Sequence, residues 1–295
     1  MSNLIAVTGD FSSGSTLMFT LFRKTQEYYS LYEPLHEQLL EYLIWPLKVD
    51  EHHFFVDDYF SEYKGMRDIP TLFKPHWGNS ELFLKPEDKA DDLYRYLSYV
   101  TGSAFGRAEK VMFKENRLTF RLAWFRANFP HARVIHLFRE KRSQWNSVVR
   151  RVQAHHGRED VGQNSTGFTG FNIATWCNDL TPQFPHLAAE NFTNGFDRFS
   201  ALWDLSYEEN KRHSDISISY HELTHNFEAT FERVKECIGG SFEVAPLKQW
   251  VIPKEQQTEL VVEKPGLKRK SKDLVEKATR KYAKARLLAQ TLIRS

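Results

Sequence analysis

Five short runs of β-branched and aromatic residues alternate with longer stretches whose apolar residues recur at helical spacing, and this alternation constrains the fold most. It is typical of βαβ units, in which each crossover helix returns the chain to the same sheet as a parallel strand. The expected strands are residues 4–8, 28–32, 110–114, 133–138 and 215–220. We therefore predict an α/β fold with three layers, helices covering both faces of a central parallel sheet.

Helical spacing marks seven stretches between and after these strands. They lie at residues 17–22, 35–43, 93–100, 122–129, 145–152, 196–203 and 227–238. Residues 50–85, 154–190 and 241–270 are expected to form long irregular loops, which in a compact domain often carry function. A basic amphipathic helix at about 271–293 would complete a single domain over residues 1–295.

Composition excludes several classes of protein. Aromatic residues make up 14% of the 295 residues, which is too much apolar surface for a disordered chain. The two cysteines, Cys177 and Cys237, are too few for a disulfide framework or a zinc cluster and are most simply two buried thiols of a protein in a reducing compartment. We see no export signal and no apolar stretch of the roughly 18 residues that a membrane span needs, so we expect a cytoplasmic protein.

The formal net charge of +2 conceals an uneven distribution. Residues 264–295 contain eleven lysines and arginines against two acids, a charge of +9 that leaves −7 for residues 1–263. A second basic stretch, residues 131–151, has six lysines and arginines against Glu140 alone. Both stretches suit an anionic partner, although a basic helix is as often only a solvated face.

The sharpest motif lies between the first strand and the first helix. Residues 9–16 have the form G-x-x-x-x-G-S-T, and backbone N–H groups of such a loop, together with the helix dipole, bind anions. This predicts a P-loop-like nucleotide fold. NTPase loops of this spacing place lysine where Ser15 stands, which weakens a triphosphate interpretation. The alternative is an ordinary turn with a serine-rich helix cap.

A second motif follows the fourth strand. Arg139 stands at its carboxyl end and Ser147 eight residues later on the next helix, and a guanidinium with a hydroxyl suits a phosphate monoester. Ligands of open parallel sheets bind outside the carboxyl ends of the strands. Glu33 and the segments Lys114-Glu115-Asn116-Arg117 and Tyr220-His221-Glu222 also follow strands and should meet at that edge.

Together these motifs resemble, in order and spacing, the sulfotransferases that use 3′-phosphoadenosine 5′-phosphosulfate (PAPS) and release PAP. The resemblance covers roughly residues 4–240 and is nearest to the carbohydrate sulfotransferases and their bacterial relatives. The segments that carry it are Ser13-Gly14-Ser15-Thr16, Tyr32-Glu33-Pro34-Leu35, Arg133 to Arg139 with Ser147, and Tyr220-His221-Glu222-Leu223.

The resemblance implies a role for each motif. Ser12, Ser13, Gly14, Ser15 and Thr16 would hold the 5′-phosphosulfate. Arg139 and Ser147 would hold the 3′-phosphate, and Glu33 would match the carboxylate proposed as base in the carbohydrate branch. No metal is expected. From the residues alone, Glu33 is as well explained as an exposed acid at a strand end.

One position departs from the family pattern. The family loop carries arginine or lysine two positions before its glycine, and this chain has Ser12 there. We expect another cation to stabilise the departing phosphosulfate, with Lys114 the first candidate and Lys268 the second.

The acceptor is less constrained by the sequence. Histidines at positions 52, 53, 76, 155, 156 and 221 are candidates for acceptor binding or a rival base, but their spacing does not indicate a metal site. Four loop aromatics could stack on a sugar or form a small core of their own: Trp77, Phe168, Phe171 and Trp176.

The sequence therefore predicts a PAPS-dependent sulfotransferase that acts on a hydroxyl of a carbohydrate-containing acceptor, a glycan or glycolipid. A phosphoryl-transfer enzyme with a degenerate loop and a non-catalytic binder of PAP or a polyanion are the alternatives. Nucleic acid is not expected as a partner, because no recognised binding module accompanies the basic residues. The oligomeric state is left open.

Overall fold

The computed structural model describes residues 3–10, 12–44, 58–156 and 173–251 of the 295-residue chain, and side chains are described throughout except at 151–156. The described residues belong to one compact unit, Met1–Val251. The basic helix expected at about 271–293 and Lys268 lie outside the described residues. The prediction of a single domain over the whole chain therefore stays a prediction.

All five expected strands form, each within one residue of its predicted ends. They are β1 (Leu4–Thr8), β2 (Tyr29–Tyr32), β3 (Val111–Lys114), β4 (Arg133–Phe138) and β5 (Ile216–Ser219). Every strand contact is parallel, and the order across the sheet is β2-β3-β1-β4-β5. β1 and β3 are buried along their full length, which explains why these strands lack the polar alternation of a half-exposed strand.

Ten α-helices and several 3₁₀ turns connect the strands in the described parts of the chain. The α-helices are α1 (Ser15–Thr25), α2 (Leu39–Ile44), α3 (Ile69–Leu72), α4 (Asp91–Phe105), α5 (Leu122–Asn128), α6 (Lys141–His156), α7 (Ile173–Leu180), α8 (Gly195–His213), α9 (Tyr220–His225) and α10 (Phe227–Ile238). The 3₁₀ helix η3 (Asn116–Arg121) follows β3 directly. α10 ends at Gly239 in the left-handed conformation, as its sequence predicts.

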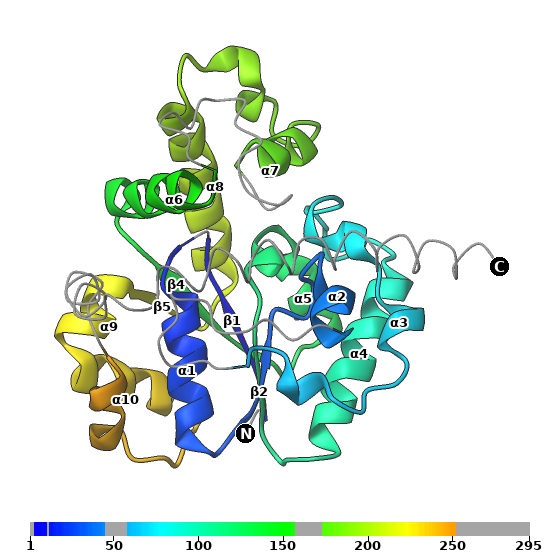
Figure 1. The fold of residues 1–295 in the computed structure, drawn as a ribbon, viewed down its shortest axis with the longest axis vertical. Coiled ribbons are helices and arrows are strands. Elements are labelled where there is room, and N and C mark those ends of the chain that lie inside the picture. The colour runs from blue at the N-terminus through cyan, green and yellow to red at the C-terminus, as the bar shows by residue number, and fades with distance from the viewer. Residues whose placement is uncertain (1–2, 11, 45–57, 157–172, 252–295) are drawn as a thin grey trace, which may run out of the picture. The chain divides into compact units, whose positions relative to one another are not determined.

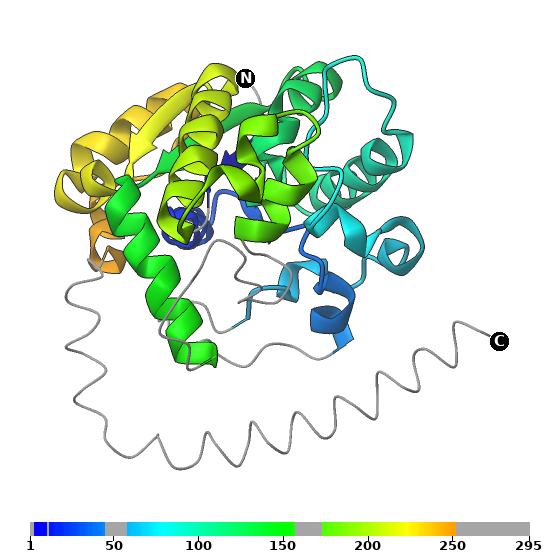
Figure 2. The same ribbon diagram turned by 90° about the horizontal axis from the view of Figure 1, so that it is seen from above.

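The helices cover both faces of the sheet, which confirms the three-layer prediction (Figures 1 and 2). On one face α1 packs against α10, where the rings of Phe22 and Phe231 meet at 5.9 Å. On the other face α5 packs on β3 through Phe125 and Phe113, and α8 lies beside α5 and β4. This division is what right-handed crossovers require, since the chain moves one way along the sheet after β1 and the other way after β2.

The strand register brings the ends of β1, β2 and β3 to one level. Lys114, the last residue of β3, is paired with Tyr32 of β2 on one side and with Val7 of β1 on the other. Glu33 is the next residue after β2, and its N–H donates to the Lys114 carbonyl at 2.8 Å. The topology thus places Glu33 and Lys114 side by side, next to the loop that leaves β1.

The expectation of irregular loops at 50–85 and 154–190 is partly wrong. α3 lies in the first stretch, and α7 lies in the second because residues 173, 176, 177 and 180 form an apolar stripe. Trp176 is fully buried in a second apolar cluster with Phe120 and Phe199, and Trp77 is buried in the main core. Both aromatics therefore form core, whereas Phe168 and Phe171 lie outside the described residues. No helix in the described ranges is long and apolar enough to cross a membrane.

Candidate active site

The loop between β1 and α1 has a backbone that only glycine accommodates at position 14. Gly14 has φ 98°, and a Cβ atom there would lie 2.3 Å from Cδ2 of Tyr220. Ser12 also adopts a positive φ, of 55°. At Gly9 a Cβ atom would lie 2.3 Å from the Leu137 carbonyl oxygen. The two glycines of the motif thus allow the loop to pack tightly against β4 and α9.

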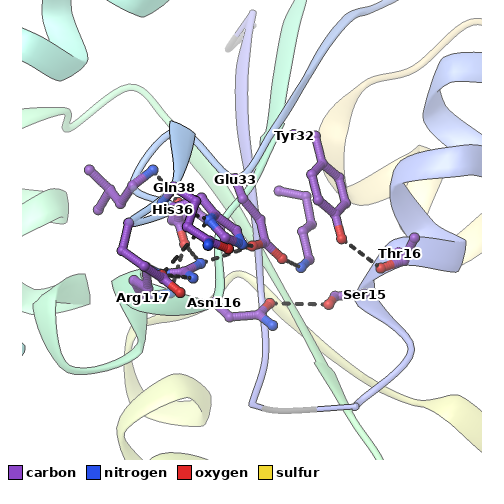
Figure 3. A network of polar contacts seen from close by, with 12 residues as sticks. Ser15, Thr16, Tyr32, Glu33, His36, Gln38, Asn116 and Arg117 are labelled. Atoms are coloured by element: carbon purple, nitrogen blue, oxygen red, sulfur yellow. Dashed lines mark hydrogen bonds and ion pairs between the residues drawn. The ribbon is translucent and has the colours of Figure 1, made fainter. Parts of the chain in front are cut away.

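The same loop presents hydrogen-bond donors at the start of α1. Gly14 caps the helix without a side chain, so the first-turn N–H groups of this 11-residue helix receive no side-chain cap. The buried hydroxyls of Ser12 and Ser13 have no hydrogen-bond partner among the described residues. Ser15 donates instead to Asn116 Oδ1 at 3.1 Å (Figure 3). The loop therefore offers an anion two hydroxyls and the positive end of a helix.

Glu33 is a buried ion-paired carboxylate and not an exposed acid at a strand end. It is 7% exposed and has φ 39°, a conformation rare for a residue with a side chain. Its Oε1 is paired with the Lys114 ammonium, and its Oε2 accepts from Nη1 of Arg117 at 2.9 Å (Figure 3). The structure thus joins the two residues that the sequence singled out for catalysis, and it pairs Glu33 with Arg117 as well.

Arg117 holds three carboxylates at once. Besides Glu33, its Nη2 donates to Glu37 Oε2 at 2.6 Å and its Nη1 to Glu115 Oε1 at 3.4 Å. Glu115 in turn accepts backbone N–H groups from Leu35 at 2.6 Å and from Arg117 at 2.9 Å. Because the Arg117 side chain is fully buried, this network fixes the turn after β2 against η3.

The cations control the charge of Glu33. Burial by itself would raise the pKa of the Glu33 carboxyl, but Lys114 and then Arg117 outweigh burial and hold that pKa well below its usual range. Burial lowers the pKa of Lys114, and Glu33 opposes this change. Glu33 is therefore ionised, and it is a weak base for as long as both cations contact it.

His36 is a neighbour that sequence reasoning missed. Its Nδ1 accepts the backbone N–H of Gln38 at 3.1 Å, and its Nε2 lies 3.8 Å from Glu33 Oε2. Burial, with Arg117 second, lowers the pKa of His36 to about 4, so the ring is neutral near pH 7. The Gln38 contact assigns the single ring proton to Nε2. With Nε2 protonated and Nδ1 accepting the Gln38 N–H, the His36 ring is less suited than the Glu33 carboxylate to accept a proton.

Two aromatic rings connect the loop to its surroundings. The hydroxyl of Tyr32 lies 3.2 Å from Thr16 Oγ1, and the Lys114 ammonium lies 4.8 Å from the centre of the Tyr32 ring (Figure 3). The second ring, Tyr220, contacts Gly14 as described and has the guanidinium of Arg139 4.8 Å from its centre. The sequence singled out Tyr220 because it comes at the end of the fifth strand. Its contacts with Gly14 and Arg139 could not be predicted in this way, because they bring together segments that are far apart in the chain.

Arg139 is pre-oriented at the end of β4. Its Nε donates to Ser143 Oγ at 3.0 Å in the first turn of α6, while Tyr220 lies against its plane. Ser147 follows one turn after Ser143 on the same helix and is buried. Arg139 and the loop around Gly14 thus both lie against the Tyr220 ring, and Ser147 is a buried residue of the helix that follows Arg139.

Of the histidines that the sequence singled out, His76 and His221 have described side chains. His52, His53 and the side chains of His155 and His156 lie outside the described residues. His76 pairs with the exposed Glu81 at 3.4 Å, and His221 stacks on His225 with ring centres 4.1 Å apart. Within the described ranges, no three His, Cys, Asp or Glu side chains gather as a metal site.

No family model matches the chain. No curated protein matches it either. Among solved structures, the chain is similar to the crystal structure of sulfotransferase STF9 from Mycobacterium avium, with 14% sequence identity and a TM-score of 0.47. The match covers 90% of this chain and 69% of STF9.

Proposed function

We propose that the protein is a PAPS-dependent sulfotransferase that transfers the sulfuryl group to a hydroxyl of a carbohydrate-containing acceptor and releases PAP. Ser12 to Thr16 bind the 5′-phosphosulfate, Arg139 and Ser147 bind the 3′-phosphate, and Glu33 accepts the proton of the acceptor hydroxyl. The carbohydrate acceptor rests on the resemblance of Glu33 to the carboxylate of that branch.

The observation that carries the proposal is the contact of one ring, Tyr220, with both candidate anion sites. The ring packs on Gly14 and under the Arg139 guanidinium, 4.8 Å from its centre. A nucleotide with phosphate groups at both its 5′ and 3′ positions fits such a pair of sites, because helix N–H groups suit one anion and a guanidinium fork suits the other. The hydroxyls of Ser12 and Ser13, which have no hydrogen-bond partner in the part of the chain that the structure describes, suit the same ligand.

The charged network supplies the remaining chemistry. In sulfuryl transfer the acceptor oxygen attacks sulfur while the bond from sulfur to the phosphate oxygen breaks, and the electron pair leaves on the phosphate. Lys114 is the cation that would stabilise this charge in place of the missing cation at Ser12. Glu33, next to Lys114, would receive the acceptor proton.

Phosphoryl transfer is the second candidate, favoured only by the spacing of the loop. Ser15 occupies the position where an NTPase loop has lysine, and its hydroxyl is bonded to Asn116. A lysine side chain there would have to replace this contact, so we rank the NTPase function below sulfuryl transfer. Non-catalytic binding of PAP is the third candidate, since Glu33 is held as a weak base.

Turnover with a panel of acceptors tests the proposal. The protein is incubated with PAPS and glycans, glycolipids or phenols, and the products are analysed by mass spectrometry. We expect a carbohydrate to gain a sulfuryl group, and we expect Glu33→Gln to abolish this turnover while the variant still binds PAP. If PAP binds but no acceptor is sulfated, the protein is a binder and not an enzyme.

A further inference from the structure

Both carboxylate oxygens of Glu33 face a cation, and this arrangement conflicts with a role as base. Lys114 is paired with Oε1, and Arg117 Nη1 lies 2.9 Å from Oε2. A carboxylate between two cations has a low affinity for a proton. If Glu33 is to receive the proton of an acceptor, one cation has to move away first.

Both cations are buried, with 2% of the Lys114 side chain and none of the Arg117 side chain exposed, but they differ in their ion-pair partners. Arg117 has no exposed side-chain surface and also contacts Glu37 at 2.6 Å and Glu115 at 3.4 Å, so its departure would remove one cation from three buried carboxylates at once. Lys114, by contrast, has Glu33 as its only ion-pair partner within the described residues. Its charge is carried on a flexible four-carbon chain. Lys114 is therefore the cation that can exchange.

A path for Lys114 runs along the Tyr32 ring. The ammonium lies 4.8 Å from the ring centre, and the hydroxyl of the same ring lies 3.2 Å from Thr16 Oγ1 in the first turn of α1. One tyrosine thus contacts both the cation that holds Glu33 and the helix end that would bind the anion. The four rotatable bonds of a lysine side chain are the means by which the ammonium would move along this ring.

We infer that Lys114 is an exchangeable cation, which pairs with Glu33 in the absence of nucleotide and transfers to the 5′-phosphosulfate when the donor binds. This inference rests on the proposed function. The transfer frees Oε1 of Glu33 at the moment when the donor is in place. The acceptor oxygen then forms its bond to sulfur, the bond from sulfur to the phosphate oxygen breaks, the electron pair leaves on the phosphate beside Lys114, and the proton passes to Oε1.

The groups around Glu33 determine what the exchange does to its basicity. Lys114 comes from β3, Arg117 and Glu115 from η3 and its cap, and His36 and Glu37 from the turn after β2. Burial favours the protonated carboxyl, and Lys114 is the strongest opponent of burial. Removing Lys114 therefore raises the pKa of Glu33, so donor binding itself activates the base.

A double-mutant cycle on PAP affinity tests the exchange. PAP carries the 5′-phosphate to which Lys114 would move, and its dissociation constant is measured by calorimetry for the full-length wild-type protein, Glu33→Gln, Lys114→Met and the double variant. Because Lys114 must leave Glu33 in order to bind, removing the Glu33 charge should tighten PAP binding by about tenfold. In the Lys114→Met background, Glu33→Gln should leave the affinity unchanged.

Glu37→Gln is the matched control, because Glu37 is buried as Glu33 is, at 11% against 10% side-chain exposure, and contacts the same arginine without contacting Lys114. It should change PAP affinity by less than about twofold. If Glu33→Gln does not fold, Glu33→Asp replaces it in the test. Aspartate keeps the charge but has a shorter side chain, so its pair with Lys114 is weaker and PAP should again bind more tightly than to the wild-type protein.

The possible outcomes test the exchange of Lys114 and the proposed sulfotransferase function separately. Tightening that depends on Lys114 supports the exchange. Equal effects of Glu33→Gln with and without Lys114, or weaker binding by Glu33→Gln or Glu33→Asp, overturn the exchange and leave the proposed function standing. Absence of PAP binding by the wild-type protein removes the proposed function, and the exchange with it.

Discussion

At the scale of single residues, position 14 is the one that most clearly requires glycine. It combines a φ of 98° with the close approach of Tyr220. The sequence motif indicated that this glycine lies in a βα turn, but it could not show that a tyrosine 206 residues later in the chain, Tyr220, fills the space above it. That contact needs the strand order, which places β5 only two positions from β1.

Gly14→Ala should therefore destabilise the protein by about 1–3 kcal/mol, through backbone strain and displacement of Tyr220, and weaken PAP binding. Urea denaturation and calorimetry check this expectation. Gly102→Ala in α4 is the control, because a Cβ there meets nothing within 4 Å. It should stabilise the helix by up to about 1 kcal/mol. Equal destabilisation by the two variants would contradict the packing argument.

Arg139 should determine the preference for a 3′-phosphate. We expect wild-type protein to bind PAP more tightly than 5′-AMP, and Arg139→Met to reduce that preference by about 1.5–3 kcal/mol, the typical contribution of a hydrogen bond to a charged group. Competition calorimetry with both nucleotides measures it. Arg142→Met, which removes an exposed arginine three residues later, should retain the preference. A similar loss in both variants would indicate a general effect of charge.

At the scale of elements, η3 links the site to the turn at residues 77–81. Arg121 at its end is fully buried and donates to the carbonyls of Trp77, Ser80 and Glu81 at 2.8–2.9 Å. Its neighbour in the same short helix is Arg117, which holds Glu33. Burial lowers the pKa of Arg121 to about 10, which still leaves it charged at neutral pH.

Arg121→Met should destabilise the protein by about 3–5 kcal/mol, because three loop carbonyls lose their donors in a buried setting. Arg126→Met is the comparison, since Arg126 lies 32% exposed and shares its acid, Asp215, with Arg133. Its cost should stay below about 2 kcal/mol. Denaturation curves measure the loss of unfolding free energy in both variants. A smaller loss for Arg121→Met than for Arg126→Met would show that the turn at residues 77–81 does not depend on Arg121.

The elements themselves were largely predictable, and the exceptions have physical reasons. All five strands were expected, since apolar runs bounded by turn residues carry a strong local signal. α7 was missed because the glycines and prolines around it favour loops, although residues 173–180 have helical periodicity. Their positions after strands put Glu33 and Arg117 at one sheet edge, but their direct contact and the presence of His36 beside Glu33 depend on how η3 packs against the turn after β2, which spacing does not show.

At the scale of the whole molecule, buried histidines tie stability to pH. Burial lowers the pKa of His136 in β4 to about 3 and, with Arg117 second, that of His36 to about 4, both from an ordinary value of 6.5. The unfolded chain therefore binds more protons than the folded protein below about pH 6.5. The stability that the two neutral histidines contribute is complete above about pH 6.5, and it is lost as the pH falls to their pKa values in the folded protein.

We expect the free energy of unfolding to fall between about pH 6.5 and pH 4, with His36 alone responsible for about 3 kcal/mol by the end of that range. Urea denaturation at several pH values measures the slope. In His136→Gln, the slope of the unfolding free energy against pH should decrease by the contribution of one proton taken up on unfolding, whatever the variant's absolute stability. An unchanged slope would show that His136 is not buried in its neutral form.

The proposed function depends on which nucleotide the folded protein binds. The most direct test is the melting temperature of the full-length protein in the presence of PAP, PAPS or ATP with Mg²⁺. Ligand at about 100 times its dissociation constant stabilises the folded state by about 2.7 kcal/mol, which raises the melting temperature by several degrees. We predict this rise with PAP and PAPS and none with ATP and Mg²⁺. A rise with ATP and Mg²⁺ alone would contradict the sulfotransferase assignment and favour phosphoryl transfer.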